Sequence, residues 1–187
     1  MRIFLDTEFL EDGKTIDLIS IGMVREDGQE LHLGNIDADW NRIYKDAWLM
    51  ENVVPKLPHI SDRSFWKTRT DIQQRVSEFC NTIITGESFK LVGESFVPEF
   101  WAYYADYDWV VFCQLFGRMI DLPKNWPKYC NDFKQYIKMF GFETEHQSEE
   151  VAHNALEDAK WLRDEFKRLY FDAELMQKDI FDERNVK

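Results

Sequence analysis

The sequence predicts an α/β fold in which three antiparallel strands come first and helices alternate with further strands after them. Apolar, β-favouring runs fill residues 2–34 and are separated by Asp-Gly turns at Asp12-Gly13 and Asp27-Gly28. From Asp39 onward, apolar residues instead recur every three or four positions, as on an amphipathic helix. Two later β-like runs, 89–93 and 100–104, interrupt the helical pattern. This order of elements is typical of a sheet with helices packed on it.

Composition favours one globular domain over residues 1–187. The length of 187 residues is usual for a single domain and is enough to bury a substantial core. Hydrophobic residues make up 44% and aromatic residues 16%, which excludes a disordered chain. Residues 172–187 are rich in acids and are expected to form a frayed C-terminal tail.

The net charge of −12 argues against a protein that coats long nucleic acids with a broad basic face. It leaves room for an enzyme that holds only the end of a strand, where bound cations supply the positive field.

The three cysteines and the absence of targeting signals favour the cytoplasm. Cys80, Cys113 and Cys130 are odd in number and form no C-x-x-C pair, so neither a disulfide framework nor a zinc ribbon is indicated. The N-terminus runs directly into the first strand, and no segment approaches about 18 consecutive apolar residues. Neither secretion nor a membrane span is expected.

The first helical pattern runs from Asp39 to Asn52 and is expected to be closed by Pro55 and Pro58. Its apolar stripe consists of Trp40, Ile43, Tyr44, Ala47 and Trp48. The segment 61–69 is expected to be a loop anchored by Phe65 and Trp66, with a substrate-contacting flap as the alternative.

Three more helices are expected between residues 70 and 141. The first carries Ile72 and ends near Gly86, and the second starts around Asp108 and ends at Gly117. The third is capped by Asn131 or Asp132 and closed by Gly141.

The last helix is expected to begin after His153. Asn154, with Glu157 three residues on, resembles a capping box, so His153 would lie on the preceding loop. Asp158 falls beside the core stripe of this helix, where a buried acid needs a partner. The stripe itself is formed by Ala155, Ala159, Leu162, Phe166 and Leu169.

Asp6 and Glu8 follow the first apolar run, Ile3 to Leu5. Residues two apart in a strand point to the same face, so an extended chain would aim both carboxylates at one place. Their mutual repulsion would be relieved by a divalent cation, and oxygen ligands favour Mg²⁺ or Mn²⁺. In the alternative interpretation, the strand ends at Leu5 and both acids are solvated.

Asp108 lies at a strand-to-helix junction, where an Asp can also serve as a helix cap. Asp106 is a rival for the same role. Together with Asp6, Glu8 and Asp158, such a carboxylate could bind two cations about 4 Å apart, the arrangement that promotes phosphodiester hydrolysis. A neutral His153 would complete the set as a general base.

The order of these motifs resembles the DEDDh subclass of the DnaQ-like, or RNase H-like, 3′-5′ exonucleases. D-x-E occurs at Asp6 and Glu8, Tyr-Asp at Tyr107-Asp108, and H-x-x-x-x-D from His153 to Asp158. The runs 6–24 and 101–117 most closely resemble the polyadenylate-specific 3′-exoribonuclease AS group of bacteria. The resemblance implies a mixed five-stranded sheet, with three antiparallel strands first, flanked by helices.

The resemblance also implies an activity and a site. Asp6, Glu8, Asp108 and Asp158 would bind two Mg²⁺ or Mn²⁺ ions, and His153 would act as the general base. The implied reaction is hydrolysis of single-stranded RNA from its 3′ end to 5′-mononucleotides. Thr7 and Phe9 would contact the substrate, with core packing as the alternative for Phe9. Relatives of this kind are often homodimers.

Two alternative functions stay open. One is a 3′-5′ DNA exonuclease of proofreading or trimming type that acts on single-stranded DNA. The other is a non-catalytic nucleotide-binding relative, against which the presence of all five expected catalytic residues counts. Tyr104 departs from the family pattern, because many relatives carry Asn at that position.

Overall fold

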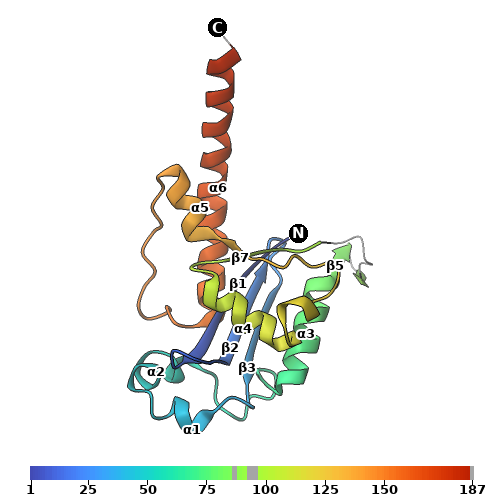
Figure 1. The fold of residues 1–187 in the computed structure, drawn as a ribbon, viewed down its shortest axis with the longest axis vertical. Coiled ribbons are helices and arrows are strands. Elements are labelled where there is room, and N and C mark those ends of the chain that lie inside the picture. The colour runs from blue at the N-terminus through green and yellow to red at the C-terminus, as the bar shows by residue number, and fades with distance from the viewer. Residues whose placement is uncertain (86–87, 92–96, 186–187) are drawn as a thin grey trace.

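A six-stranded mixed sheet of order β4-β3-β2-β1-β7-β8 forms the centre of the fold, with helices on both of its faces (Figure 1). The computed structural model describes the backbone of residues 1–85, 88–91 and 97–185, and the side chains of residues 1–82 and 97–170. The predicted α/β class, with three antiparallel strands first, is confirmed.

The first three strands are β1 (Arg2–Glu11), β2 (Ile16–Arg25) and β3 (Glu30–Asn35), and they pair antiparallel in sequence order. β1 does not end at Leu5 but continues through Asp6 and Glu8, so the alternative in which both acids follow the strand is wrong. Within this register, Asp6 lies opposite Gly22 on β2.

The outer strands are parallel to their neighbours. β7 (Glu99–Ala102) pairs with β1, β8 (Asn131–Asp132) with β7, and β4 (Trp66–Lys67) with β3. The sheet therefore has six strands where five were expected. β4 and β8 are two residues long, too short to produce an alternating pattern in the sequence.

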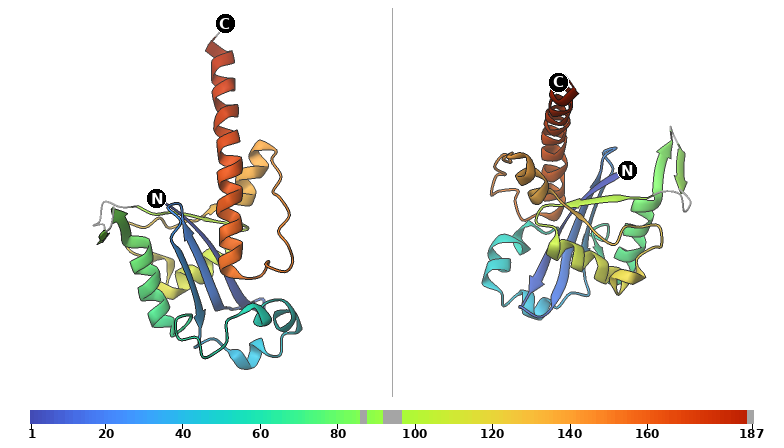
Figure 2. Two further views of the ribbon diagram at one scale, coloured as in Figure 1. Left: turned by 180° about the vertical axis from the view of Figure 1, so that it is seen from behind. Right: turned by 45° about the horizontal axis from the view of Figure 1, so that its top comes forward.

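The β-like run 89–93 does not join the main sheet. Its described part belongs to β6 (Ser88–Leu91), which pairs with β5 (Thr82–Thr85) in a separate hairpin beyond α3 (Figure 2). Val92 and Gly93 lie outside the described residues.

Helices α3 (Arg69–Asn81) and α4 (Asp106–Phe116) cover one face of the sheet, and α5 (Phe133–Phe140) and α6 (Ala155–Asn185) cover the other (Figure 2). Ile3 and Leu5 of β1 pack under α3 and α4, whereas Phe4 packs under α5 and α6. β1 is therefore buried on both faces and holds its polar residues rigidly.

The helix expected over residues 39–52 is broken in two, as α1 (Trp40–Ile43) and α2 (Ala47–Asn52), and η1 (Val54–Lys56) follows. Asp46 causes the break, because its side chain accepts a hydrogen bond from the Leu49 backbone N–H at 2.9 Å and starts a second helix. As a result, Tyr44 and Trp48 leave the expected apolar stripe and are exposed.

Two other helix boundaries differ from expectation. α3 ends at Asn81, because residues 82–85 extend into β5, and Gly86 lies outside the described residues. The backbone of residues 172–185, expected to be frayed, continues α6 to Asn185 beyond the rest of the molecule (Figure 1).

The segment 61–69 is a loop only in part, because Trp66 and Lys67 form β4 and α3 begins at Arg69. Phe65 and Trp66 are buried and anchor it, as expected. The helix ends predicted later in the chain are confirmed. Gly117 ends α4, Asp132 caps α5, and Gly141 closes α5 in a left-handed conformation. A short 3₁₀ helix, η2 (Met119–Asp121), follows α4. Within the described part of the chain, no helix combines the length and hydrophobicity needed to cross a bilayer.

Candidate active site

Asp6 and Glu8 lie on one face of β1, in the part of the strand that does not pair with β7. β7 pairs only with Arg2, Ile3 and Phe4, so the edge of β1 is free from Leu5 onward. Glu8 is only 7% exposed, although no cation lies beside it in the primary sequence. An ionised carboxylate at such a position requires a partner from elsewhere in the fold.

Asp108 reaches this free edge from the first turn of α4. Its Oδ1 accepts hydrogen bonds from the Thr7 backbone N–H at 2.8 Å and from Thr7 Oγ1 at 2.6 Å. Ala105, not Asp108, is the N-cap of α4, so the capping alternative does not describe Asp108. The rival Asp106 is exposed to solvent.

The start of α6 brings Asp158 and His153 to the same place. Asn154 caps the helix, and its Oδ1 accepts hydrogen bonds from the Leu156 and Glu157 backbone N–H groups at 3.2 and 3.3 Å. The expected helix start after His153 is therefore confirmed. His153 adopts a φ of +61°, a conformation that non-glycine residues rarely take.

A glycine on β2 permits this position of α6. A Cβ atom added to Gly22 would lie 2.1 Å from the backbone carbon and oxygen of Ala155, so the first turn of α6 rests directly on the strand. Gly22 also lies opposite Asp6 in the sheet. The close approach therefore sets the distance between α6 and the carboxylates of β1.

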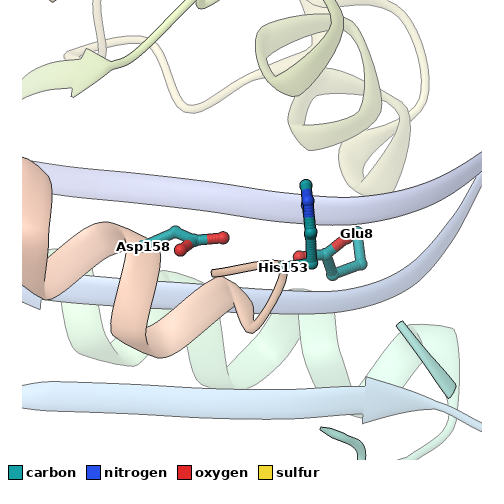
Figure 3. Close-up of side chains that lie close together, drawn as sticks. All are labelled: Glu8, His153 and Asp158. Carbon is teal, nitrogen blue, oxygen red and sulfur yellow. The ribbon is translucent and has the colours of Figure 1, made fainter. Parts of the chain in front are cut away.

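The side chains of Glu8, His153 and Asp158 lie close together (Figure 3). One ligand atom from each lies within 4.8 Å of those from the other two. Asp158 points from α6 toward Glu8, and His153 comes from the loop before the helix (Figure 3). The Asp158 Oδ1 also accepts a hydrogen bond from Gln147 Nε2 at 2.6 Å.

All seven site residues predicted from the sequence line one cavity of about 340 Å³, namely Asp6, Thr7, Glu8, Phe9, Asp108, His153 and Asp158. Aromatic side chains complete its wall: Trp48, Tyr103, Tyr104 and Tyr107. The Phe9 ring stacks on Tyr107, with ring centroids 5.8 Å apart. A second cavity of about 610 Å³ adjoins it and shares Asp6, Tyr103, His153 and Asp158.

Burial and mutual repulsion raise the pKa of the two carboxylates on β1. Burial, followed by the charges of Asp108, Glu8 and Asp158, raises the pKa of Asp6 well above its usual range. Burial and the charges of Asp158 and Asp108 raise the pKa of Glu8 to about 8. Both groups therefore resist ionisation near neutral pH in the protein alone.

The other two carboxylates are affected less strongly, because hydrogen bonds oppose the effect of burial. Burial raises the pKa of Asp108 to about 6, while the hydrogen bonds from Thr7 lower it. Burial likewise raises the pKa of Asp158 to about 6, against the hydrogen bond from Gln147. Burial and the charge of Lys56 lower the pKa of His153, which keeps its imidazole neutral at physiological pH.

The donor set has the chemistry of a site for hard divalent cations. Carboxylates that repel one another in a buried cavity are stabilised by a doubly charged ion, and they offer only oxygen ligands. The neutral His153 beside Glu8 and Asp158 could accept a proton or add a nitrogen ligand.

Comparison with known proteins identifies the family. Residues 1–169 match the model of the 3′-5′ exoribonuclease Rv2179c-like domain. Two proteins of Mycobacterium tuberculosis are each 36% identical to this chain over 168 residues, which cover 90% of this chain and 90% of each relative. They are the 3′-5′ exoribonuclease Rv2179c of strain H37Rv and the 3′-5′ exoribonuclease MT2234.1 of strain CDC 1551. The chain belongs to the Rv2179c-like 3′-5′ exoribonuclease family. The predicted enzyme class and the exonuclease resemblance are confirmed.

A solved structure supports the fold in addition. The Mg²⁺- and Mn²⁺-bound form of Pop2p from S. pombe aligns with a TM-score of 0.50 over 91% of this chain and 84% of that chain. Because the identity is 13%, this likeness bears on the fold alone, and it agrees with the predicted RNase H-like fold.

Sequence reasoning missed several residues of this candidate site. The helical pattern places Trp48 on the apolar stripe of a helix, but its side chain is 52% exposed and lines the cavity. Gln147 and Lys56 carry no motif signal, because one lies on a loop without regular structure and the other in a 3₁₀ turn. Only Gly22 offered a hint, as a glycine within a strand often marks a close approach of another backbone.

Proposed function

We propose that this member of the Rv2179c-like family is a divalent-metal-dependent hydrolase that removes 5′-mononucleotides from the 3′ end of single-stranded RNA. Residues 1–187 would act as one catalytic domain. Asp6, Glu8, Asp108 and Asp158 would hold two Mg²⁺ or Mn²⁺ ions, and His153 would be the general base.

One observation carries the proposal: four carboxylates from β1, α4 and α6 line a single cavity, and none of them has a cationic hydrogen-bond partner among the described contacts. Such a cluster is unstable without positive charge. Divalent cations would supply that charge and, when bound, act as Lewis acids toward water and the phosphodiester. The Mg²⁺ and Mn²⁺ named for Pop2p are in keeping with this donor set.

The protein groups divide the remaining work. Thr7 holds the Asp108 carboxylate, and Gln147 holds that of Asp158, so both acids keep a fixed orientation. The neutral His153 imidazole would accept the proton of the attacking water. Because its ring lies beside Glu8 and Asp158, the proton would be removed next to the carboxylate cluster.

The aromatic wall suits the bases of a single strand. Tyr104 and Tyr107 are exposed at the cavity, Phe9 stacks on Tyr107, and Trp48 also lines the cavity. Bases of single-stranded RNA stack on such side chains independently of their sequence. With a net charge of −12, the protein would hold only the terminal nucleotides and not a long stretch of backbone.

Degradation of matched oligonucleotides tests the proposal. We expect a 5′-labelled single-stranded RNA to shorten from its free 3′ end, whereas the same RNA with a 3′-phosphate block or a complementary strand should be degraded more slowly. Faster degradation of the matching DNA would favour the DNA exonuclease alternative. Binding without degradation of either polymer would favour a non-catalytic relative. A homodimer and a cytoplasmic location stay predictions.

A further inference from the structure

The loop that carries His153 is held by another part of the chain. Residues 142–154 form neither helix nor strand, so this loop cannot position His153 through a backbone ladder of its own. Between its own residues, the loop forms a backbone turn in which the Val151 and Ala152 N–H groups donate to the Ser148 carbonyl, at 3.1 and 3.0 Å. External contacts must therefore fix the loop.

Contacts with α6 hold the first part of the loop, at Glu145 and Gln147, and Lys56 at the end of η1 holds the part next to His153. The Lys56 ammonium donates hydrogen bonds to the backbone carbonyls of Ala152 and Glu149, the latter at 3.0 Å. In return, Asn154 Nδ2 donates to the Lys56 carbonyl at 3.5 Å. The two segments, almost a hundred residues apart in sequence, are thus tied on both sides of His153.

Trp48 on α2 adds a contact to His153 itself. The two rings meet edge to face, with centroids 4.9 Å apart and planes at 78°. The segment from Trp48 to Lys56 thus touches both the His153 ring and the backbone around it. The positive φ of His153 is unfavourable for a residue with a Cβ atom, so such support is needed to maintain it.

We propose that Lys56 is a positioning residue that holds the 149–154 loop, and with it His153, against the carboxylate cluster. This role rests on the proposed function, because it assigns Lys56 to the placement of the general base. Two of the three ammonium donors are directed at loop carbonyls, so the main task of Lys56 is to hold the loop and not to bind a substrate phosphate.

The test compares three variants of the full-length chain. Lys56→Met removes the ammonium but retains the aliphatic stem, and Lys56→Arg restores a cationic donor. Lys45→Met is the matched control, because Lys45 is an exposed lysine in the turn between α1 and α2, outside the cavity lining. Unchanged circular dichroism spectra would establish that each variant is folded.

In the activity measurement, we expect Lys56→Met to lower kcat for single-stranded RNA by about 10²-fold, the effect of a catalytic group displaced by about 1 Å. KM should change less than about threefold, Lys56→Arg should recover most of kcat, and Lys45→Met should match the wild type. An unchanged kcat would overturn the proposal. So would a raised KM at constant kcat, which would make Lys56 a phosphate contact.

A second measurement needs no activity. Amide hydrogen exchange at Val151 and Ala152 in the free protein should become at least about tenfold faster in Lys56→Met and stay unchanged in Lys45→Met. Equal exchange rates in wild type and Lys56→Met would refute the proposal that the hydrogen bonds of Lys56 hold the loop. If wild-type protein failed to degrade RNA, the proposed function would fall, while this exchange measurement would still decide whether Lys56 holds the loop.

Discussion

Single residues in this site act mainly by fixing the orientation of carboxylates. Asp108 is held twice by Thr7, through the backbone N–H and through the hydroxyl. The family resemblance implies that Thr7 contacts the substrate, but its hydroxyl already donates a hydrogen bond to the Asp108 carboxylate. The substrate contact stays a prediction, and the hydrogen bond gives Thr7 a second role.

Replacing Thr7 separates these roles. Thr7→Val removes the hydroxyl donor, so the pKa of Asp108 should rise further and its hold on a cation should weaken. Because a hydrogen bond to a charged group contributes about 1.5–3 kcal/mol, we expect Mn²⁺ affinity at pH 7 to fall by about 10- to 100-fold in titration calorimetry. Thr7→Ser retains the hydroxyl and should remain near wild type. Equal affinities in both variants would argue against this role.

His153 can be tested as a base against its alternative role as a ligand. His153→Ala should lower kcat by about 10²–10⁴-fold, the usual contribution of a general base, while the protein stays folded. Mn²⁺ affinity should stay close to the wild-type value if His153 is a base. A large loss of Mn²⁺ binding would instead make the imidazole a cation ligand, as its position beside Glu8 and Asp158 also allows.

At the scale of elements, the sequence predicts a strand or helix correctly where residues within that segment determine its conformation. Asp-Gly turns and β-favouring runs were enough to predict β1–β3, and a capping box placed the start of α6. The break between α1 and α2 was missed because the apolar stripe continued through it, and only the side chain of Asp46 interrupts the helix.

The residues of the site likewise fall into those with a local sequence signal and those without one. Asp6 and Glu8 could be predicted because residues two apart in a strand share a face. Asp108, Asp158 and His153 could be predicted because they lie at or just before the start of a helix. Lys56 and Gln147 could not be, since their contacts form only when a loop without regular structure folds back on distant elements. Contacts of that kind leave no periodic or motif signal in one sequence.

Because the first turn of α6 packs directly on Gly22 of β2, adding a methyl group at this glycine should have a specific effect. Gly22→Ala would force the Ala155 backbone away from the strand and carry His153 and Asp158 with it. We expect kcat to fall by about 10²-fold, together with a loss of about 1–3 kcal/mol in the free energy of unfolding.

Gly34→Ala is the matched control for this prediction. Its Cβ would also clash, at 2.2 Å, but with the Phe65 ring and away from the cavity that the four carboxylates line. It should therefore lose comparable stability in denaturant titrations and retain kcat. A similar kcat for both variants would show that the approach of α6 to β2 does not set the catalytic geometry.

For the molecule as a whole, we expect the clustered carboxylates to couple the free energy of unfolding to pH and to divalent cations. Each has a pKa raised in the folded state, so the protonated form is favoured there and stability declines as pH rises through the folded values, about 6 for Asp108 and Asp158 and about 8 for Glu8. Because the ordinary pKa values of these carboxyls are about 4, this loss extends from about pH 4 to about pH 8. It is separate from the effect of Asp12 and Asp121, whose pKa values hydrogen bonds from Thr15 and Arg118 lower to about 2.

Thermal unfolding measures this coupling. In EDTA, Tm should fall as pH rises from about 5 to 8, and Mn²⁺ should raise Tm more at pH 8 than at pH 5, because it binds the ionised cluster. In EDTA, Glu8→Gln should make the decrease of Tm with pH smaller, because it removes the carboxyl group whose pKa is raised to about 8 by burial and by the charges of Asp158 and Asp108. A Tm in EDTA that rises over this range would be incompatible with the cluster as described.

The most direct test of the central claim is the release of mononucleotides from a 3′-labelled single-stranded RNA, followed after EDTA treatment and again after a titration with Mn²⁺. The four-carboxylate cluster predicts that release stops in EDTA and returns with added Mn²⁺ in the wild type. It should not return in Asp108→Asn, which retains the shape of the side chain but loses its charge. Release that continues undiminished in EDTA would contradict the account.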